Sequence, residues 1–227
     1  MDNSRTELLI GRENCQLIAR KTVAIIGTGG VGGMVAISLC RCGVQNFALV
    51  DFDKVSPSNC NRQVVAWQDT IGKNKVDVLK NMILAINPFA KVEAICKRVE
   101  KESLQEIFEK QSFDIVVDAI DSVADKVELI CYCKNNNINI ISAMGAGNRI
   151  GVPQFQVSDI YKTHDDALAK VMRKKLKERG VSTLQVVYSS EKPIKTNGPV
   201  GSMAYQVQSC ALVICSEIIN KILRREI

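Results

Sequence analysis

Short apolar runs alternate with helix-like stretches through the first two-thirds of the chain. The runs are rich in Val and Ile, a composition typical of buried strands. The stretches between them repeat apolar residues at helical spacing, and stop signals such as Gly43 and Asn87-Pro88 follow them. Strands are expected at residues 21–27, 45–51, 91–96, 113–120 and 138–144. Helices are expected at residues 30–42, 72–86, 102–111 and 122–134.

The pattern changes in the C-terminal third. Residues 153–160 and 183–190 alternate apolar and polar side chains, as half-exposed strands do, around a basic helix expected at 165–179. A long apolar helix at 202–223 follows. The expected fold class is α/β: a doubly wound, Rossmann-like, mostly parallel sheet with additional antiparallel strands in the C-terminal third. No linker or repeat divides the chain, so residues 1–227 are expected to form a single domain.

Composition narrows the class of protein. The 227 residues are 46% hydrophobic, enough for a full core, and carry a net charge of +6. No apolar run approaches the ~20 residues of a membrane span, and the polar N-terminus lacks a signal-peptide pattern, so a cytoplasmic protein without membrane contact is expected. The nine cysteines include no CxxC pair, which argues against structural zinc. The mild positive charge is compatible with a nucleotide or RNA partner.

A glycine loop lies between the first expected strand and the first expected helix. Gly27, Gly29 and Gly32 form GxGxxG there, with Gly30 between them. Such a loop makes a tight turn and lets the backbone approach a phosphate at the helix N-terminus. Asp51 ends the second strand, where a carboxylate can bind a ribose hydroxyl. A nucleotide site is therefore predicted.

The residues after Asp51 argue for a triphosphate. Asn59, Arg62 and Lys75 follow the second strand, at the same edge of the sheet as the glycine loop. Two cations converging on that edge suit ATP better than the two phosphates of NAD. Asp121 ends a later strand at the same edge and is the candidate ligand for Mg²⁺, which prefers one or two carboxylates plus substrate phosphates.

Four motifs, in this order and spacing, resemble the adenylating enzymes related to ubiquitin activators, ThiF and MoeB. They are GTGGVGG, DFDKVSPSNCNRQ, GKNKVD and DAIDS. The resemblance implies that ATP binds on the glycine loop and that a substrate carboxylate attacks its α-phosphate. It makes Asp51 the ribose ligand, Asp121 the magnesium ligand, and Asn59, Arg62 and Lys75 the residues that contact the phosphates. It also implies a homodimer in which Arg5 reaches the partner's ATP.

The segment 159–193 is similar to one branch of that family, the tRNA threonylcarbamoyladenosine dehydratases. In that branch ATP activates the carboxylate of threonylcarbamoyladenosine, which then cyclises with net loss of water. The resemblance gives the basic helix a role at tRNA phosphates. Its candidate residues are Lys170, Arg173, Lys174, Lys175, Lys177 and Arg179. A solvated helix face, with Leu168, Val171, Met172 and Leu176 turned inward, explains the same pattern.

Three other functions remain open. One is adenylation of the C-terminal glycine of a small ubiquitin-like sulfur carrier, which would bring a sulfur-relay partner. Another is a non-catalytic ATP-binding paralogue, because the chain lacks the longer insert that family members carry after the position of Lys195. The third is an NAD-dependent oxidoreductase, but no Tyr-x-x-x-Lys pair or poised histidine is evident for hydride chemistry.

Overall fold

A seven-stranded sheet forms the centre of the molecule. The computed structural model describes residues 1–227. The strand order is β3-β2-β1-β4-β5-β7-β6, and every neighbouring pair is parallel except the antiparallel pair β6 and β7. The strands are β1 (Thr22–Ile26), β2 (Asn46–Val50), β3 (Lys91–Ile95), β4 (Ile115–Asp118), β5 (Ile140–Ala143), β6 (Phe155–Asp159) and β7 (Gln185–Ser189).

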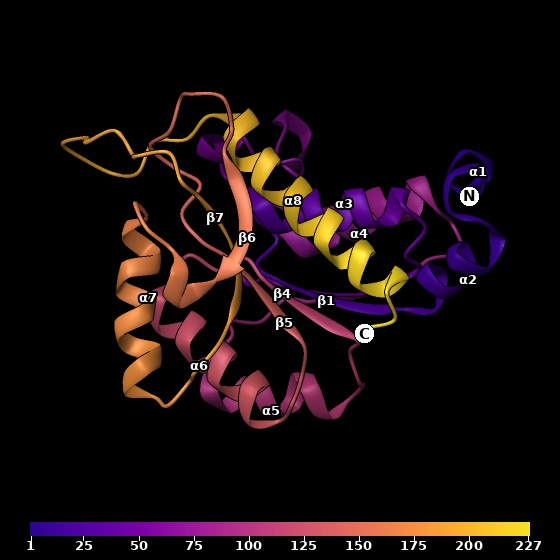
Figure 1. Ribbon diagram of the computed structural model, residues 1–227. Helices are drawn as coiled ribbons and strands as arrows, with labels where there is room; N and C mark the ends of the chain where they lie inside the picture. Colours follow the sequence, from indigo (N-terminus) through magenta and orange to yellow (C-terminus); the bar gives the residue numbers. More distant parts are fainter.

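Helices cover both faces of the sheet (Figure 1). One face carries α2 (Arg12–Arg20), α3 (Gly30–Arg41), α4 (Lys75–Ile86) and α8 (Ala204–Leu223). The opposite face carries α5 (Lys101–Glu109), α6 (Val123–Asn135) and α7 (Ala167–Glu178). Side chains of β1 alternate between these layers: Ile25 belongs to the first hydrophobic cluster and Ile26 to the second. This arrangement confirms the predicted doubly wound α/β class.

Differences from the predicted elements are local. The N-terminal helices α1 (Ser4–Ile10) and α2 were not predicted, because each is too short to show a clear helical repeat of apolar residues. The helix α4 begins at Lys75 rather than residue 72, since Gly72 has φ +86° in the preceding turn. The antiparallel pair expected in the C-terminal third is formed by β6 and β7, and β7 also pairs with β5 in parallel. No helix has the length and apolarity needed to span a membrane.

The topology places a ligand site at the carboxyl edge of the sheet. The chain proceeds from β1 outward to β2 and β3, and then returns to the other side of β1 to build β4 and β5. Open α/β sheets bind ligands at such a switch point. The glycine loop, Asp51, Asp121 and the Gly145–Gly147 loop follow β1, β2, β4 and β5 at that edge.

Candidate active site

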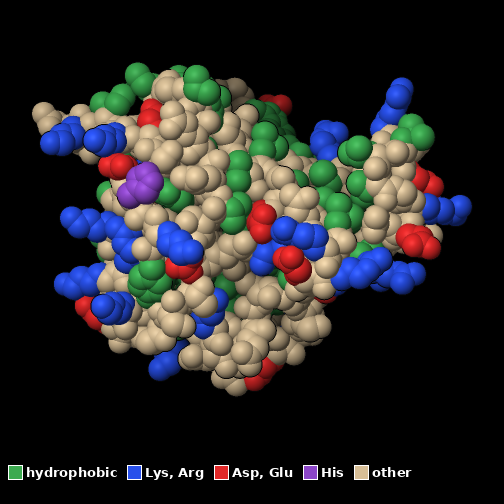
Figure 2. All heavy atoms as spheres, viewed as in Figure 1, with side chains coloured by type: hydrophobic (Ala, Val, Ile, Leu, Met, Phe, Trp, Pro, Cys, Tyr) green, Lys and Arg blue, Asp and Glu red, His purple; other side chains and the backbone are tan.

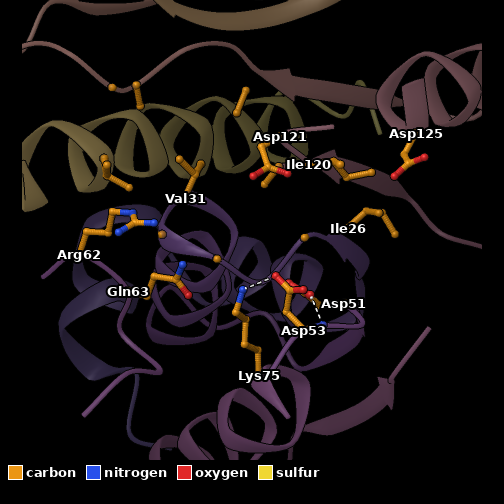
Figure 3. A pocket seen from close by; sticks show the side chains of 18 of the residues that line it. Ile26, Val31, Asp51, Asp53, Arg62, Gln63, Lys75, Ile120, Asp121 and Asp125 are labelled. Carbon is orange, nitrogen blue, oxygen red and sulfur yellow. Dashed lines mark hydrogen bonds and ion pairs between the residues drawn. The ribbon is translucent and has the colours of Figure 1, made fainter. Parts of the chain in front are cut away.

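A cavity of about 540 Å³ opens at this edge. The glycine loop, the loop after β2, the turn after β4 and the loop after β5 line it, and α8 completes one wall through Val207. Figure 3 shows the acidic and basic side chains converging on its centre from different elements. Residues far apart in the sequence therefore meet in one site, as the motif positions predict.

The glycine loop makes two close approaches. Gly27 has φ +87°, and a Cβ there would lie 2.7 Å from the carbonyl oxygen of Ala119 in the turn after β4. A Cβ on Gly32 would lie 1.9 Å from the carbonyl oxygen of Gly27, so only glycine lets α3 pack this closely on the end of β1. Gly27, Gly29 and Gly30 line the cavity, whereas Gly32 does not. The N-terminus of α3, which favours anions, lies at the cavity wall.

Asp51 is held in place by its neighbours. Its Oδ2 accepts hydrogen bonds from the backbone N–H (2.7 Å) and hydroxyl (3.1 Å) of Thr28. Its Oδ1 accepts one from the backbone N–H of Asp53 at 2.9 Å. A carboxylate has about four acceptor positions, so Asp51 retains capacity for a ligand hydroxyl within the cavity that it lines.

Lys75 begins α4 and reaches the cavity as part of an ion pair. Its Nζ lies 2.7 Å from Oδ2 of Asp53, and its side chain is only 6% exposed (Figure 3). Asp53, half-exposed in the same cavity, was not predicted as a site residue. The carboxylate of Asp53 compensates the charge of a nearly buried ammonium, and a phosphate can take the place of that carboxylate.

Arg62 lines the cavity, but Asn59 does not. The Nη1 of Arg62 donates to the carbonyl of Ser58 (2.9 Å) and to Oδ1 of Asn61 (2.8 Å). Asn59 is buried, and its Oδ1 accepts from the backbone N–H of Ser56 at 3.1 Å, which caps the short 3₁₀ helix Pro57–Asn59. The expected contact of Asn59 with the phosphates stays a prediction. Its backbone carbonyl accepts from the N–H of Arg62.

Asp121 is the one carboxylate of the cavity that is exposed and has no hydrogen-bond or ion-pair partner. Asp125 also lines the cavity, but its Oδ2 pairs with Arg98 at 3.0 Å. No cluster of three or more acidic, Cys or His side chains is present to hold a metal without help. One free carboxylate fits Mg²⁺ that is bound mainly through substrate phosphates.

Gln63 is a site residue that the sequence analysis missed. Its side chain is 8% exposed and lines the cavity, and its Oε1 is buried without a hydrogen-bond partner. Buried amide oxygens normally have a partner, so the orphaned atom points to a ligand donor. The one indication of Gln63 in the sequence is that it directly follows Arg62, a predicted site residue.

Other candidates lie elsewhere. Arg5 lies on α1, beside a separate surface depression, and does not line its own chain's cavity. His164 contacts Asp165 (3.0 Å) and the ring of Tyr188 but does not line the cavity, and Cys60 is exposed outside it. The cavity lining contains no Cys or His side chain.

The basic helix α7 is partly engaged within the protein. Arg179 pairs with Glu128 at 2.6 Å, and Nη1 of Arg173 donates to the carbonyl of Thr163 at 3.0 Å. Val171 is 43% exposed, so the expectation that it turns inward was wrong; Ala169 takes the buried position. The lysines of α7 are exposed and unpaired: Lys170, Lys174, Lys175 and Lys177.

Several known proteins are similar to this chain in sequence and in fold. The ThiF family matches residues 3–226. A tRNA threonylcarbamoyladenosine dehydratase of Bacillus subtilis is 42% identical over 192 residues, which are 84% of this chain and 75% of that protein. The Escherichia coli enzyme of the same name is 37% identical, over 76% of this chain and 64% of its own length. A crystal structure of the E. coli protein in complex with ATP superposes with a TM-score of 0.91 and 31% identity, over 98% of this chain and 94% of that one.

Proposed function

The chain belongs to the ThiF family, and from that premise we propose that it uses ATP to activate the carboxylate of threonylcarbamoyladenosine in tRNA and closes it into a ring. The observation that carries the proposal is the convergence of Asp51, Arg62, Lys75 and Asp121 on one cavity beside the glycine loop. The identity to dehydratases of B. subtilis and E. coli over most of this chain supports the substrate.

The site's own side chains suit adenylation. Asp51 binds the ribose, and the N-terminus of α3 receives phosphates. Arg62 and Lys75 stabilise the negative charge that accumulates at the α-phosphorus when the substrate carboxylate attacks it and pyrophosphate leaves. Asp121 would hold Mg²⁺, which would neutralise phosphate charge. No protein nucleophile is required, because the attacking carboxylate is already ionised at neutral pH.

Ring closure needs only groups of the substrate itself. A nitrogen of the same modification attacks the activated acyl carbon, its proton is lost, and AMP leaves. The nucleoside thereby loses one water, while ATP becomes AMP and pyrophosphate. Holding the nitrogen against the acyl carbon is the protein's contribution, through orientation rather than covalent catalysis. We place the reaction in the cytoplasm, where tRNA is available.

A homodimer forms part of the proposal. Arg5 lies outside its own cavity, on the short helix α1, so a role at the nucleotide requires a second subunit. The exposed side chains of Leu8 and Leu9 on the same helix are consistent with a helix that is covered in an assembly.

ATP–pyrophosphate exchange tests the function. We expect labelled pyrophosphate to enter ATP when tRNA bearing threonylcarbamoyladenosine is added, because adenylation is reversible before ring closure. The control is the same tRNA without the modification, which lacks the carboxylate. Exchange stimulated by a Gly-Gly-ended carrier protein would instead support the sulfur-carrier reaction. ATP binding without exchange on either substrate would support a non-catalytic paralogue.

A further inference from the structure

The segment 191–203, which joins β7 to α8, projects from the body beside the cavity (Figure 1). It contributes Val200 and Ser202 to the cavity lining. On the neighbouring side, Leu168 of α7 lines the same cavity. The segment and α7 therefore border the site, as does the Gly145–Gly147 loop.

Asn148 ties both limbs of this segment to the Gly145–Gly147 loop. Its backbone N–H donates to the carbonyl of Gly201 (2.8 Å), and its Oδ1 accepts from the N–H of Gly201 (2.7 Å). Its carbonyl accepts from the N–H of Ile194 (2.7 Å), and its Nδ2 donates to the hydroxyl of Thr196 (3.4 Å). Asn148 has φ +56°, a conformation that is uncommon for a residue other than glycine. One residue thus fixes the segment relative to the cavity.

The outer surface of the segment is positively charged. Lys192 and Lys195 are exposed and have no ion-pair partner. The segment's only acid, Glu191, points toward the body, where its Oε1 accepts from the N–H groups of Ile150 (3.1 Å) and Gly151 (3.0 Å). Its negative charge therefore does not offset the two lysines at the outer surface.

The positively charged surface continues on the helix α7. Lys170, Lys174 and Lys177 are exposed at a spacing of four and three residues, which places them on one face of the helix. Figure 2 shows basic side chains along this side of the molecule, from the projecting segment down over α7, with the histidine between them. We name the five residues Lys170, Lys174, Lys177, Lys192 and Lys195 the lysine strip.

We propose that the lysine strip is a docking surface for the phosphate backbone of RNA, and that Asn148 holds its 191–203 part in place. The geometry favours a polyanion that also enters the cavity, because both elements of the strip contribute a lining side chain, Leu168 and Val200. RNA bound along the strip would present an unstacked nucleoside to the cavity. The identity of that nucleoside rests on the proposed function; the binding of RNA does not.

Charge reversal tests the strip. Lys192→Glu/Lys195→Glu and Lys170→Glu/Lys174→Glu should each weaken binding of a tRNA transcript at least tenfold and flatten the salt dependence of log K, because each lost phosphate contact reduces the slope by about 0.7–0.9. The matched control is Arg20→Glu/Lys91→Glu, which makes the same change in net charge at exposed, unpaired positions elsewhere. Equal weakening by the control would overturn the proposal, as would unchanged binding in both strip variants. Binding is measured without ATP. If the wild-type protein binds the transcript through the strip but does not turn over modified tRNA, that result contradicts the proposed function and not the docking surface.

Asn148 requires a separate test, because its role is positioning. Asn148→Gly keeps the positive φ but removes the side-chain bonds to Gly201 and Thr196. We expect a KM for RNA raised about tenfold, with the Kd for ATP unchanged, and Asn148→Asp should restore most of the affinity because it retains the acceptor for Gly201. A change in ATP affinity matching that in RNA, or no rescue by Asp, would contradict a positioning role.

Discussion

Lys126 and Asp118 form an ion pair that is completely buried, with Nζ 2.9 Å from Oδ2 and neither side chain exposed. The pair holds both backbone polar groups of one residue, Ile120. Lys126 donates to the carbonyl of Ile120 (3.1 Å), and Asp118 accepts from its N–H (3.2 Å). Ser142 on β5 donates to the same carboxylate at 2.6 Å. Since Asp121 follows directly, this network fixes the turn that carries the free carboxylate of the cavity.

Lys126→Met should therefore lower the free energy of unfolding by ~3–5 kcal/mol, the typical cost of leaving one partner of a buried pair uncompensated. Urea denaturation measures it. Adding Asp118→Asn should recover most of the loss, because the remaining amide is neutral and can still accept from Ser142. A loss below ~1 kcal/mol in the single variant would show that water reaches the pair.

Gln63→Leu should separate ligand binding from stability. Leu removes a buried Oε1 that has no hydrogen-bond partner within the protein, so the free energy of unfolding should be unchanged or higher. The Kd for ATP should rise roughly tenfold, which corresponds to ~1.4 kcal/mol for one lost hydrogen bond. Calorimetric titration with ATP measures this, and Gln68→Leu, at an exposed position outside the cavity, is the control. Unchanged affinity would exclude a ligand contact by Gln63.

The sequence was sufficient to predict a site residue where the position of that residue follows from the regular sheet. Asp51 directly follows β2 and Asp121 lies in the turn after β4, and strand ends share one edge, so their meeting was predictable. Asn59 differs because it lies in an irregular loop, where its Oδ1 accepts from the backbone N–H of Ser56 and its side chain does not line the cavity. Local hydrogen bonds of this kind leave no periodic trace in a sequence.

The same reason explains the two features that were missed. The pairing of Asp53 with Lys75 depends on how the loop after β2 folds back on the start of α4, and the orphaned amide of Gln63 depends on what surrounds it in three dimensions. Neither feature follows from a fixed spacing of residues in the sequence. The catalytic roles of Arg62, Lys75 and Asp121 stay predictions, although all three line the cavity.

Arg62→Ala and Asp121→Ala should each reduce turnover roughly 100-fold or more, the scale of losing a preorganised electrostatic contact. Lys73→Ala and Asp69→Ala remove exposed charges of the same sign outside the cavity and should retain near-normal rates. Steady-state pyrophosphate release on modified tRNA measures all four. Near-normal rates for Arg62→Ala and Asp121→Ala would refute the site assignment.

Mixed dimers test the contribution of Arg5. A subunit with Arg5→Ala and a subunit with Asp121→Ala should both be inactive alone. In a mixed dimer, the site with an intact Asp121 receives Arg5 from the other subunit, so random mixing should restore about a quarter of wild-type activity. Failure to regain activity, with dimers verified by light scattering, would argue against sharing of the site.

Stability at acid pH should reveal the ion pair between α6 and α7. Hydrogen bonds from Arg179 hold the pKa of Glu128 below its ordinary value of about 4.5. A depressed carboxylate pKa stabilises the fold above that ordinary value, and the contribution disappears as the pH falls through the lower folded-state pKa. Glu128→Gln should therefore cost up to ~1 kcal/mol at pH 7, a small effect because both side chains are partly exposed. The difference from wild type should vanish under more acidic conditions and shrink in high salt. Urea denaturation across the pH series measures it, and a difference that persisted at acid pH would assign the effect to packing instead of charge.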